Sequence, residues 1–124
     1  MIITVSTEKA PAAIGPYSQA KVFDKLVFTS GQIPLVPGSG EIAGTTIEEQ
    51  AKQSLENLKA VLEAAGSDLD KVLKTTCFLS DMDNFAKFNE IYTEYFPGKP
   101  ARSCVAVKTL PKNVLVEVEA IATR

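Results

Sequence analysis

Two segments near the end of the chain carry side chains that could act together on a small molecule. Residues 101–107 and 114–122 have the composition of strands, and the connection 108–113 is short enough for an antiparallel hairpin. If the two strands pair so that the arginine of the first lies opposite a glutamate of the second, one face of the hairpin is nearly apolar. That face suits packing beneath helices. We therefore expect the other, non-helical face to carry a cation, a thiol and two carboxylates: Arg102, Cys104, Glu117 and Glu119.

This group of side chains has two interpretations. A cross-strand salt bridge on a sheet surface would contribute only ~0–1 kcal/mol to stability and would have no chemical role. Alternatively, Arg102 could hold a carboxylate through the two parallel hydrogen bonds of its guanidinium, and Glu117 could orient a water molecule beside it. Arg102 could also lower the pKa of Cys104, which is otherwise a semi-buried small residue. The spacing alone leaves both interpretations open.

Composition excludes several kinds of site. The chain has 124 residues and no histidine, which rules out Ser-His-Asp and Cys-His nucleophile systems and histidine-ligated metals. Its two cysteines cannot form a four-cysteine metal site. With 13 basic and 15 acidic residues the net charge is −2, which argues against binding to nucleic acid. Two cysteines and an N-terminus without an apolar stretch of signal length predict a cytoplasmic protein, and no run is long enough to cross a membrane.

The remaining elements must position this group. Residues 46–65 are the clearest helix, because Thr46 and Glu49 form a capping-box pattern before a stripe of apolar residues and Gly66 suits the C-terminal cap. A second helix is predicted at 84–96, with Asp83 as its cap. Further strands are predicted at residues 2–5, 21–23, 26–30 and 72–79.

This order of elements predicts one α+β domain over residues 1–124, with two helices on one face of a mixed sheet. The other face then needs a cover, because apolar residues such as Leu115 and Ile121 are expected to point toward it. Self-association through the sheet would supply that cover, and symmetric homo-oligomers are the usual form of such assemblies.

Other candidates have both a functional and a purely structural explanation. Tyr17 follows a proline-rich loop and could line a pocket or be a loop aromatic. Ser30 and Gly31 end a strand, so their backbone groups could bind a ligand or form a simple turn. Asn89 lies off the apolar stripe of the second helix, where solvent exposure is the default. Cys77 is expected to be a small core residue.

Several stretches together resemble the Rid family, the reactive intermediate deaminases also called YjgF-like proteins, and most closely its RidA branch. The matches run nearly from end to end of the chain in the expected order. They are residues 10–19 (APAAIGPYSQ), 29–34 (TSGQIP), 53–66 (QSLENLKAVLEAAG), 74–79 (KTTCFL), 100–105 (PARSCV), 110–112 (LPK) and 117–122 (EVEAIA).

The resemblance implies a chorismate-mutase-like α+β fold and a homotrimer whose sheets form a central barrel-like core, with sites in clefts between subunits. It also implies hydrolysis of reactive 2-imino acids, such as 2-iminobutanoate and 2-iminopropanoate, to 2-oxo acids and ammonia. These imines arise from dehydratases that act on serine and threonine. No metal and no cofactor are expected.

The same resemblance assigns roles to residues by position. Arg102 matches the arginine that binds the substrate carboxylate, and Glu117, rather than Glu119, matches the glutamate that positions and activates water. The matching substrate-binding positions are Tyr17, Ser30, Gly31, Asn89 and Cys104, the last through its backbone N–H. The chain departs from many members in having Ala106 in place of a glutamate and a short stretch at 96–100, which bears on the rim of the cleft.

Two other functions compete with deamination. The first is a binding or regulatory protein that senses a small carboxylate without turnover. The second is RNA cleavage with inhibition of translation, an activity attributed to some relatives, against which the net charge and the absence of histidine argue.

Overall fold

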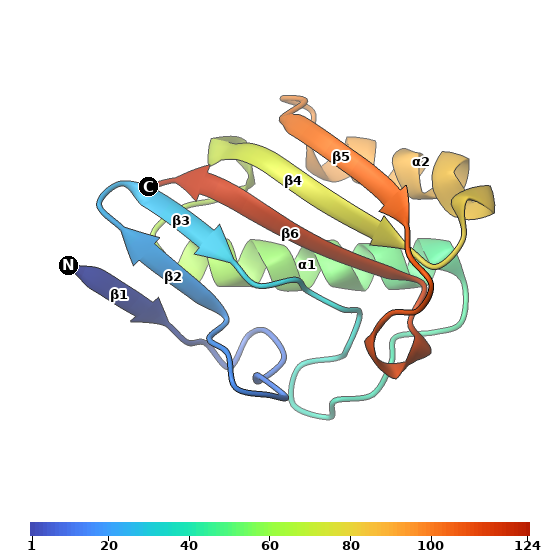
Figure 1. Ribbon diagram of the computed structural model, residues 1–124, viewed down its shortest axis with the longest axis horizontal. Helices are drawn as coiled ribbons and strands as arrows, with labels where there is room; N and C mark the ends of the chain where they lie inside the picture. The colour runs from blue at the N-terminus through green and yellow to red at the C-terminus, as the bar shows by residue number, and fades with distance from the viewer.

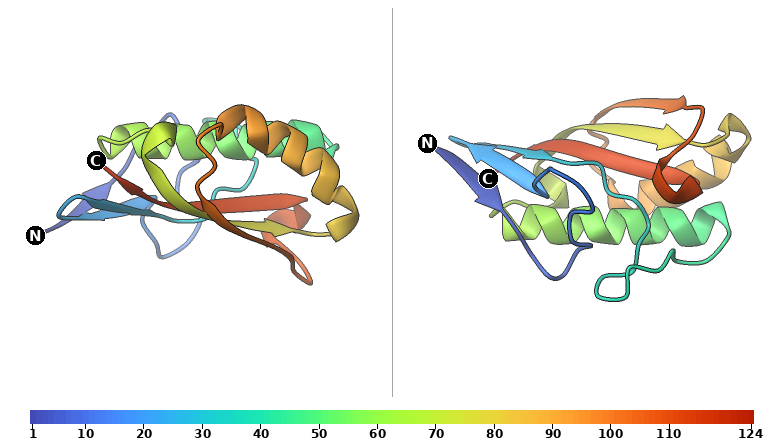
Figure 2. Two further views of the ribbon diagram at one scale, coloured as in Figure 1. Left: turned by 90° about the horizontal axis from the view of Figure 1, so that it is seen from above. Right: turned by 60° about the horizontal axis from the view of Figure 1, so that its bottom comes forward.

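The computed structural model describes residues 1–124 and contains six strands and two α-helices. In chain order these are β1 (Ile2–Val5), β2 (Ala20–Phe23), β3 (Leu26–Thr29), α1 (Ile47–Ala64), β4 (Val72–Leu79), α2 (Phe85–Tyr95), β5 (Ala101–Ala106) and β6 (Val116–Thr123). The strands form one mixed sheet in the order β1-β2-β3-β6-β4-β5. Both helices lie on one face of this sheet (Figures 1 and 2), which confirms the predicted α+β arrangement.

Helix α1 begins and ends as its sequence predicts. The Thr46 side chain accepts a hydrogen bond from the Glu49 N–H at 3.2 Å, and the Glu49 carboxylate accepts one from the Thr46 N–H, also at 3.2 Å. At the other end Gly66 has φ +84°, a conformation that favours glycine, and the Ser67 N–H donates to the Leu62 carbonyl. The apolar stripe between these caps is buried against the sheet.

Helix α2 begins at Phe85, one residue later than expected, and its cap differs from the prediction. Residues Met82–Asn84 form a 3-10 turn, and the side chain that caps this turn is Asp81, whose carboxylate accepts from the Asp83 N–H at 2.8 Å. The prediction that Asp83 caps the helix is therefore wrong. The 3-10 turn carries the chain from the end of β4 into α2.

The predicted hairpin between the last two strands is wrong. Strand β6 pairs antiparallel with β3 and β4 in the middle of the sheet, whereas β5 is an edge strand that pairs parallel with β4. Parallel neighbours need a crossover connection, and α2 is that connection between β4 and β5. The segment 107–115 then passes from the edge strand to the sheet centre, and β4 separates the two strands.

This topology places the predicted group on two faces of the sheet. Arg102 pairs with Thr75, which is fully buried on the helix-covered face. Glu117 pairs with Phe78, and residue 78 points to the face opposite that of residue 75. The expectation that the arginine, the thiol and the two glutamates share the non-helical face is therefore wrong, and so is the salt-bridge interpretation.

The core lies between the sheet and α1, and the opposite face stays open. Phe28 is 43% exposed and Val105 is 46% exposed on that open face, where Phe78 and Ile121 are half-buried. Leu115 instead packs against the core, so only Ile121 of the two predicted residues points as expected. Neither helix has the length and apolar character needed to cross a membrane.

Candidate functional site

Arg102 is held on the helix-covered side of β5 by neutral groups of α2. Its Nη1 donates a hydrogen bond to Oδ1 of Asn89 at 2.8 Å. The guanidinium carbon lies 4.8 Å from the ring centroid of Tyr92 and 5.5 Å from that of Phe85. Such cation–π contacts stabilise and orient the cation without neutralising its charge. The guanidinium is therefore oriented, and its charge is available to an anion.

The Tyr92 side chain is held in place by a hydrogen bond to the sheet. Its hydroxyl shares a hydrogen bond of 2.7 Å with Oγ1 of Thr75, which is fully buried on β4. Burial raises the pKa of Tyr92, so its hydroxyl stays protonated at neutral pH. The Tyr92 ring that contacts Arg102 is thus held by α2 through its backbone and by β4 through its hydroxyl.

Phe85 and Tyr92 are site residues that the sequence alone did not single out. Phe85, Asn89 and Tyr92 follow one another at helical spacings of four and three, so they share one face of α2. That spacing, read together with Asn89 as a site candidate, is the signal that could have identified both rings.

Cys104 lies two residues further along the same side of β5. It pairs in register with Cys77 of β4, and both thiols are free. A hydrogen bond from Cys77, assisted by the charge of Arg102 and opposed by burial, lowers the pKa of Cys104 to about 7. The same hydrogen bond, together with burial, raises the pKa of Cys77. Cys77 is a core residue, as predicted, and Cys104 is half-buried.

An open recess of about 350 Å³ lies between α2 and the start of β5. Its lining includes Asn89, Tyr92, Thr93, Lys99 and Arg102. We call Arg102, Asn89 and Cys104 the arginine group. The recess gives a small anion access to the guanidinium from the edge of the sheet.

Glu117 belongs to a second group on the open face of the sheet. It lies beside Gly31, where an added Cβ would come within 2.7 Å of the carboxyl carbon of Glu117. Two hydrogen bonds between the backbones of Gln32 and Val118, at 2.8 and 3.2 Å, fix this approach. Burial, followed by repulsion from Glu119, raises the pKa of Glu117. Because a raised pKa makes a carboxylate a stronger base, Glu117 is suited to accept a proton from water.

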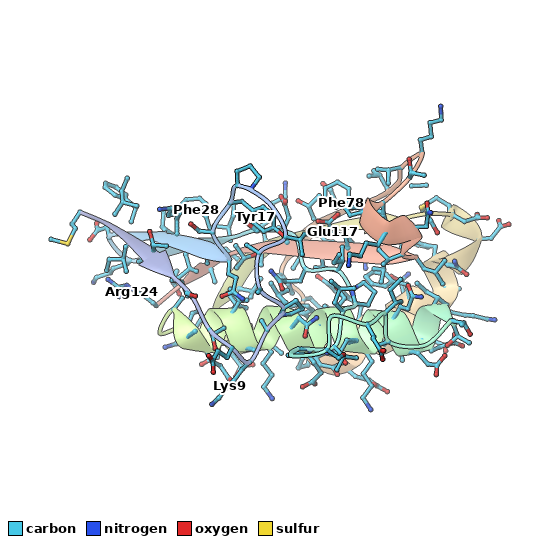
Figure 3. All side chains as sticks on the ribbon, turned by 90° about the horizontal axis from the view of Figure 1, so that it is seen from below. Lys9, Tyr17, Phe28, Phe78, Glu117 and Arg124 are labelled. Carbon is cyan, nitrogen blue, oxygen red and sulfur yellow. The ribbon has the colours of Figure 1, made fainter.

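Tyr17 and Ser30 border the same region. Tyr17 is 47% exposed, its hydroxyl accepts a hydrogen bond from the Ile14 N–H at 3.2 Å, and it lines a small crevice together with Gly31. The Ser30 hydroxyl donates to the Ser18 carbonyl at 2.6 Å and so ties the Tyr17 loop to β3. Figure 3 shows Tyr17, Glu117, Phe28 and Phe78 on the side of the sheet turned away from α1.

The structure thus sorts the predicted site residues into two groups. The arginine group faces α2, and the glutamate group, which is Glu117, Gly31, Tyr17 and Ser30, faces outward on the opposite side. Within one chain the residues of each group lie close together, but the sheet separates the two groups. The first group can bind a carboxylate, and the second can accept a proton from water.

Comparisons with known proteins agree with this architecture. The profile of a family described as Endoribonuclease L-PSP matches residues 7–124. A relative from Lactococcus lactis, named as a proposed regulator, AldR, is 53% identical over 95% of this chain and 94% of its own. The mouse protein named 2-iminobutanoate/2-iminopropanoate deaminase is 50% identical over 97% of this chain and 90% of its own.

A solved structure extends the likeness to three dimensions. Escherichia coli TdcF with bound serine superposes with a TM-score of 0.94 at 46% identity, covering 98% of each chain. The family profile spans nearly the whole sequence, and relatives at about half identity cover it almost completely. The chain therefore belongs to the Endoribonuclease L-PSP family, also known as the YjgF/Rid family.

Proposed function

We propose that this protein is a deaminase that hydrolyses reactive 2-imino acids, such as 2-iminopropanoate and 2-iminobutanoate, to 2-oxo acids and ammonia. The observation that carries the proposal is the setting of Arg102, whose partners Asn89, Phe85 and Tyr92 are all neutral. An oriented guanidinium without an acidic partner suits the carboxylate of such a substrate. The deaminase name of the mouse relative and the serine bound to TdcF, which also carries a carboxylate, support this assignment.

The complete site is proposed to form between two copies of the chain. Arg102 and Glu117 lie on opposite faces of one sheet, so a neighbouring copy must supply the second group. The open face carries Phe28, Phe78 and Val105, and exposed apolar side chains of this kind favour association. We propose a homotrimer in which these faces form a barrel-like core and three sites lie in the clefts between subunits.

In the proposed first step, Arg102 holds the substrate carboxylate and fixes which face of the C=N carbon is presented. Glu117 of the neighbouring copy accepts a proton from a water molecule as the water oxygen attacks that carbon. The protonated imine is already electrophilic, so the protein contributes mainly orientation and a restricted environment. The product of this step is a carbinolamine beside a protonated Glu117.

In the proposed second step, Glu117 returns its proton to the substrate nitrogen. The C–N bond then breaks, ammonia leaves, and the hydroxyl proton passes to the carboxylate as the C=O bond forms. A carboxyl group whose pKa is raised toward neutrality can serve in both directions. The products are a 2-oxo acid and ammonia.

Replacing Gly31 by alanine tests the placement of Glu117. The added Cβ would meet the end of the Glu117 side chain, which can move aside while the fold is kept. We expect kcat to fall by roughly tenfold or more, because a small displacement of a catalytic group is costly. Gly98→Ala is the matched control, since nothing lies within 4 Å of a Cβ at that position. Equal activity of the two variants would contradict the placement.

Substitution of Tyr92 separates its ring from its hydroxyl. Tyr92→Leu removes the platform of Arg102, and we expect KM to rise roughly 3- to 30-fold, as the loss of a cation–π contact implies. Tyr92→Phe keeps the ring but leaves Thr75 without that partner, which should cost about 1 kcal/mol of unfolding free energy and change KM little. Steady-state kinetics and urea denaturation measure both effects. The same KM in both variants would show that the ring has no positioning role.

The enzymatic proposal is tested by generating imines in situ with an amino-acid oxidase, with catalase present to remove peroxide. The disappearance of imine trapped with semicarbazide is then followed with wild-type protein and with Arg102→Ala. Acceleration by the wild type alone supports a deaminase. No acceleration by folded, oligomeric wild-type protein would favour a binding or regulatory role.

The family description also raises ribonuclease activity. RNA degradation by the same two proteins distinguishes this function, because cleavage that survives in Arg102→Ala does not depend on the arginine group. If Arg102→Ala loses RNA cleavage and the wild type does not hydrolyse imines, the result would contradict our proposal and favour a ribonuclease.

A further inference from the structure

Cys77 and Cys104 form a pair of thiols across two parallel strands. They are directly in register on β4 and β5 and project to the same, helix-covered side of the sheet. Neighbouring strands are about 4.8 Å apart, which lies within the Cα–Cα range of disulfides, about 4.4 to 6.8 Å. Only a small shift of the edge strand β5 is required to bring these two sulfur atoms together.

The two thiols differ in a way that suits sequential oxidation. Cys104 is half-buried on an edge strand, two residues from the guanidinium of Arg102, and its pKa of about 7 gives it substantial thiolate character at neutral pH. Cys77 is fully buried in the core and stays protonated. Cys104 is thus the reactive member and Cys77 the thiol placed to resolve it.

We propose that Cys104 is a site of oxidation by hydrogen peroxide and that it forms a reversible disulfide with Cys77. The Cys104 thiolate attacks one peroxide oxygen, the O–O bond breaks, and a sulfenic acid and hydroxide form. The Cys77 thiol then attacks the Cys104 sulfur, and the sulfenic oxygen leaves as water with the thiol proton. The two thiols lose two electrons and two protons in total, and peroxide is reduced to two water molecules.

The strand geometry also predicts that this disulfide is easily reduced. Side chains of an in-register parallel pair project side by side, so their Cβ atoms stay near the strand spacing of about 4.8 Å, whereas disulfides prefer about 3.8 Å. A bond formed under such strain has a more oxidising potential than a structural disulfide. This property suits a reversible modification rather than a permanent structural disulfide.

Oxidation of Cys104 is expected to weaken carboxylate binding by Arg102, a consequence that rests on the proposed function. Sγ of Cys77 lies 3.8 Å from Oγ1 of Thr75, and Thr75 shares a hydrogen bond with Tyr92, whose ring contacts the guanidinium of Arg102. A disulfide repositions Sγ of Cys77 and draws β5 toward β4. We therefore expect weaker carboxylate binding in the oxidised protein and its recovery on reduction.

The test uses purified full-length protein in three forms: wild type, Cys77→Ser and Cys104→Ser. Each is treated with hydrogen peroxide and analysed by intact mass and peptide mapping without reductant. In the wild type we expect the free thiols to fall from two per chain to none, with a Cys77–Cys104 linked peptide that phosphine treatment reverses. Cys77→Ser should accumulate a dimedone-reactive sulfenic acid at Cys104, and Cys104→Ser should keep its Cys77 thiol.

Two results would overturn this proposal. The first is a wild-type protein that keeps both thiols at peroxide concentrations that modify Cys77→Ser at Cys104. The second is a disulfide that links two chains instead of Cys77 and Cys104 of one chain. Because these readouts are masses, they do not depend on imine hydrolysis, and the proposed function can fail or hold independently.

Discussion

Replacing Arg102 by alanine is expected to lower kcat/KM for 2-iminopropanoate hydrolysis by about 30-fold or more. Removing one partner of a buried, charge-assisted contact costs about 2–5 kcal/mol, and each 1.4 kcal/mol corresponds to a factor of about ten. The loss should exceed that of an exposed charge, because Asn89, Phe85 and Tyr92 hold the guanidinium in one orientation. Steady-state kinetics on the in situ imine measures it.

Arg102→Lys makes this prediction more specific. Lysine keeps the charge but lacks the planar fork that holds a carboxylate through two hydrogen bonds, so we expect a large loss here as well. Arg124→Ala is the matched control, because the Arg124 side chain donates only to the Asp24 carbonyl, in the turn between β2 and β3. A lysine variant with wild-type kinetics would contradict a bidentate grip on the substrate.

Replacing Glu117 by glutamine is expected to reduce kcat by about 100- to 10,000-fold, the usual contribution of a general base. Glutamine has nearly the same shape, so the approach of Gly31 and the oligomeric state should be unchanged. KM should change little, since the carboxylate of the substrate is bound by Arg102. Kinetics and sedimentation measure these quantities, and normal turnover in this variant would remove the general-base role of Glu117.

The pH dependence gives an independent test of the same residue. Glu117 must be ionised to accept a proton, so kcat/KM should rise as pH increases through its pKa, which lies above the ordinary value for glutamate. Glu119→Gln removes the neighbouring negative charge and should lower that pKa. We therefore expect the acidic limb of the profile to move to lower pH, and an unchanged limb would mean that Glu117 does not set it.

Local patterns predicted the helices and the fold class well. The capping box of Thr46 and Glu49 and the glycine at position 66 set the limits of α1 within a residue or two. These signals are reliable because they act through hydrogen bonds between residues close in sequence. The open face of the sheet was likewise predicted from the position of both helices, and the exposed Phe28 and Val105 agree with it.

The pairing of the last strands could not be obtained from local patterns. Adjacent strands with a short connection usually pair, but here β6 inserts between β3 and β4. One signal pointed to this outcome, since α2 between β4 and β5 has the length of a crossover helix that joins parallel strands. Because the hairpin was wrong, Arg102 and Glu117 were placed on one face when the fold puts them on two.

The position of Arg102 and Glu117 on opposite faces of the sheet makes the proposed site depend on the assembly. A site built from one chain needs no partner. A site that needs the arginine of one copy and the glutamate of another must appear and disappear with the assembly.

The most direct test is to mix Arg102→Ala and Glu117→Gln proteins and allow subunits to exchange, for example by joint refolding. In a randomly mixed trimer about one quarter of the clefts receive an intact Arg102 from one copy and an intact Glu117 from its neighbour. We predict that two inactive proteins then regain about a quarter of the activity of refolded wild type. Mixed trimers that form but stay inactive would contradict a site shared between subunits.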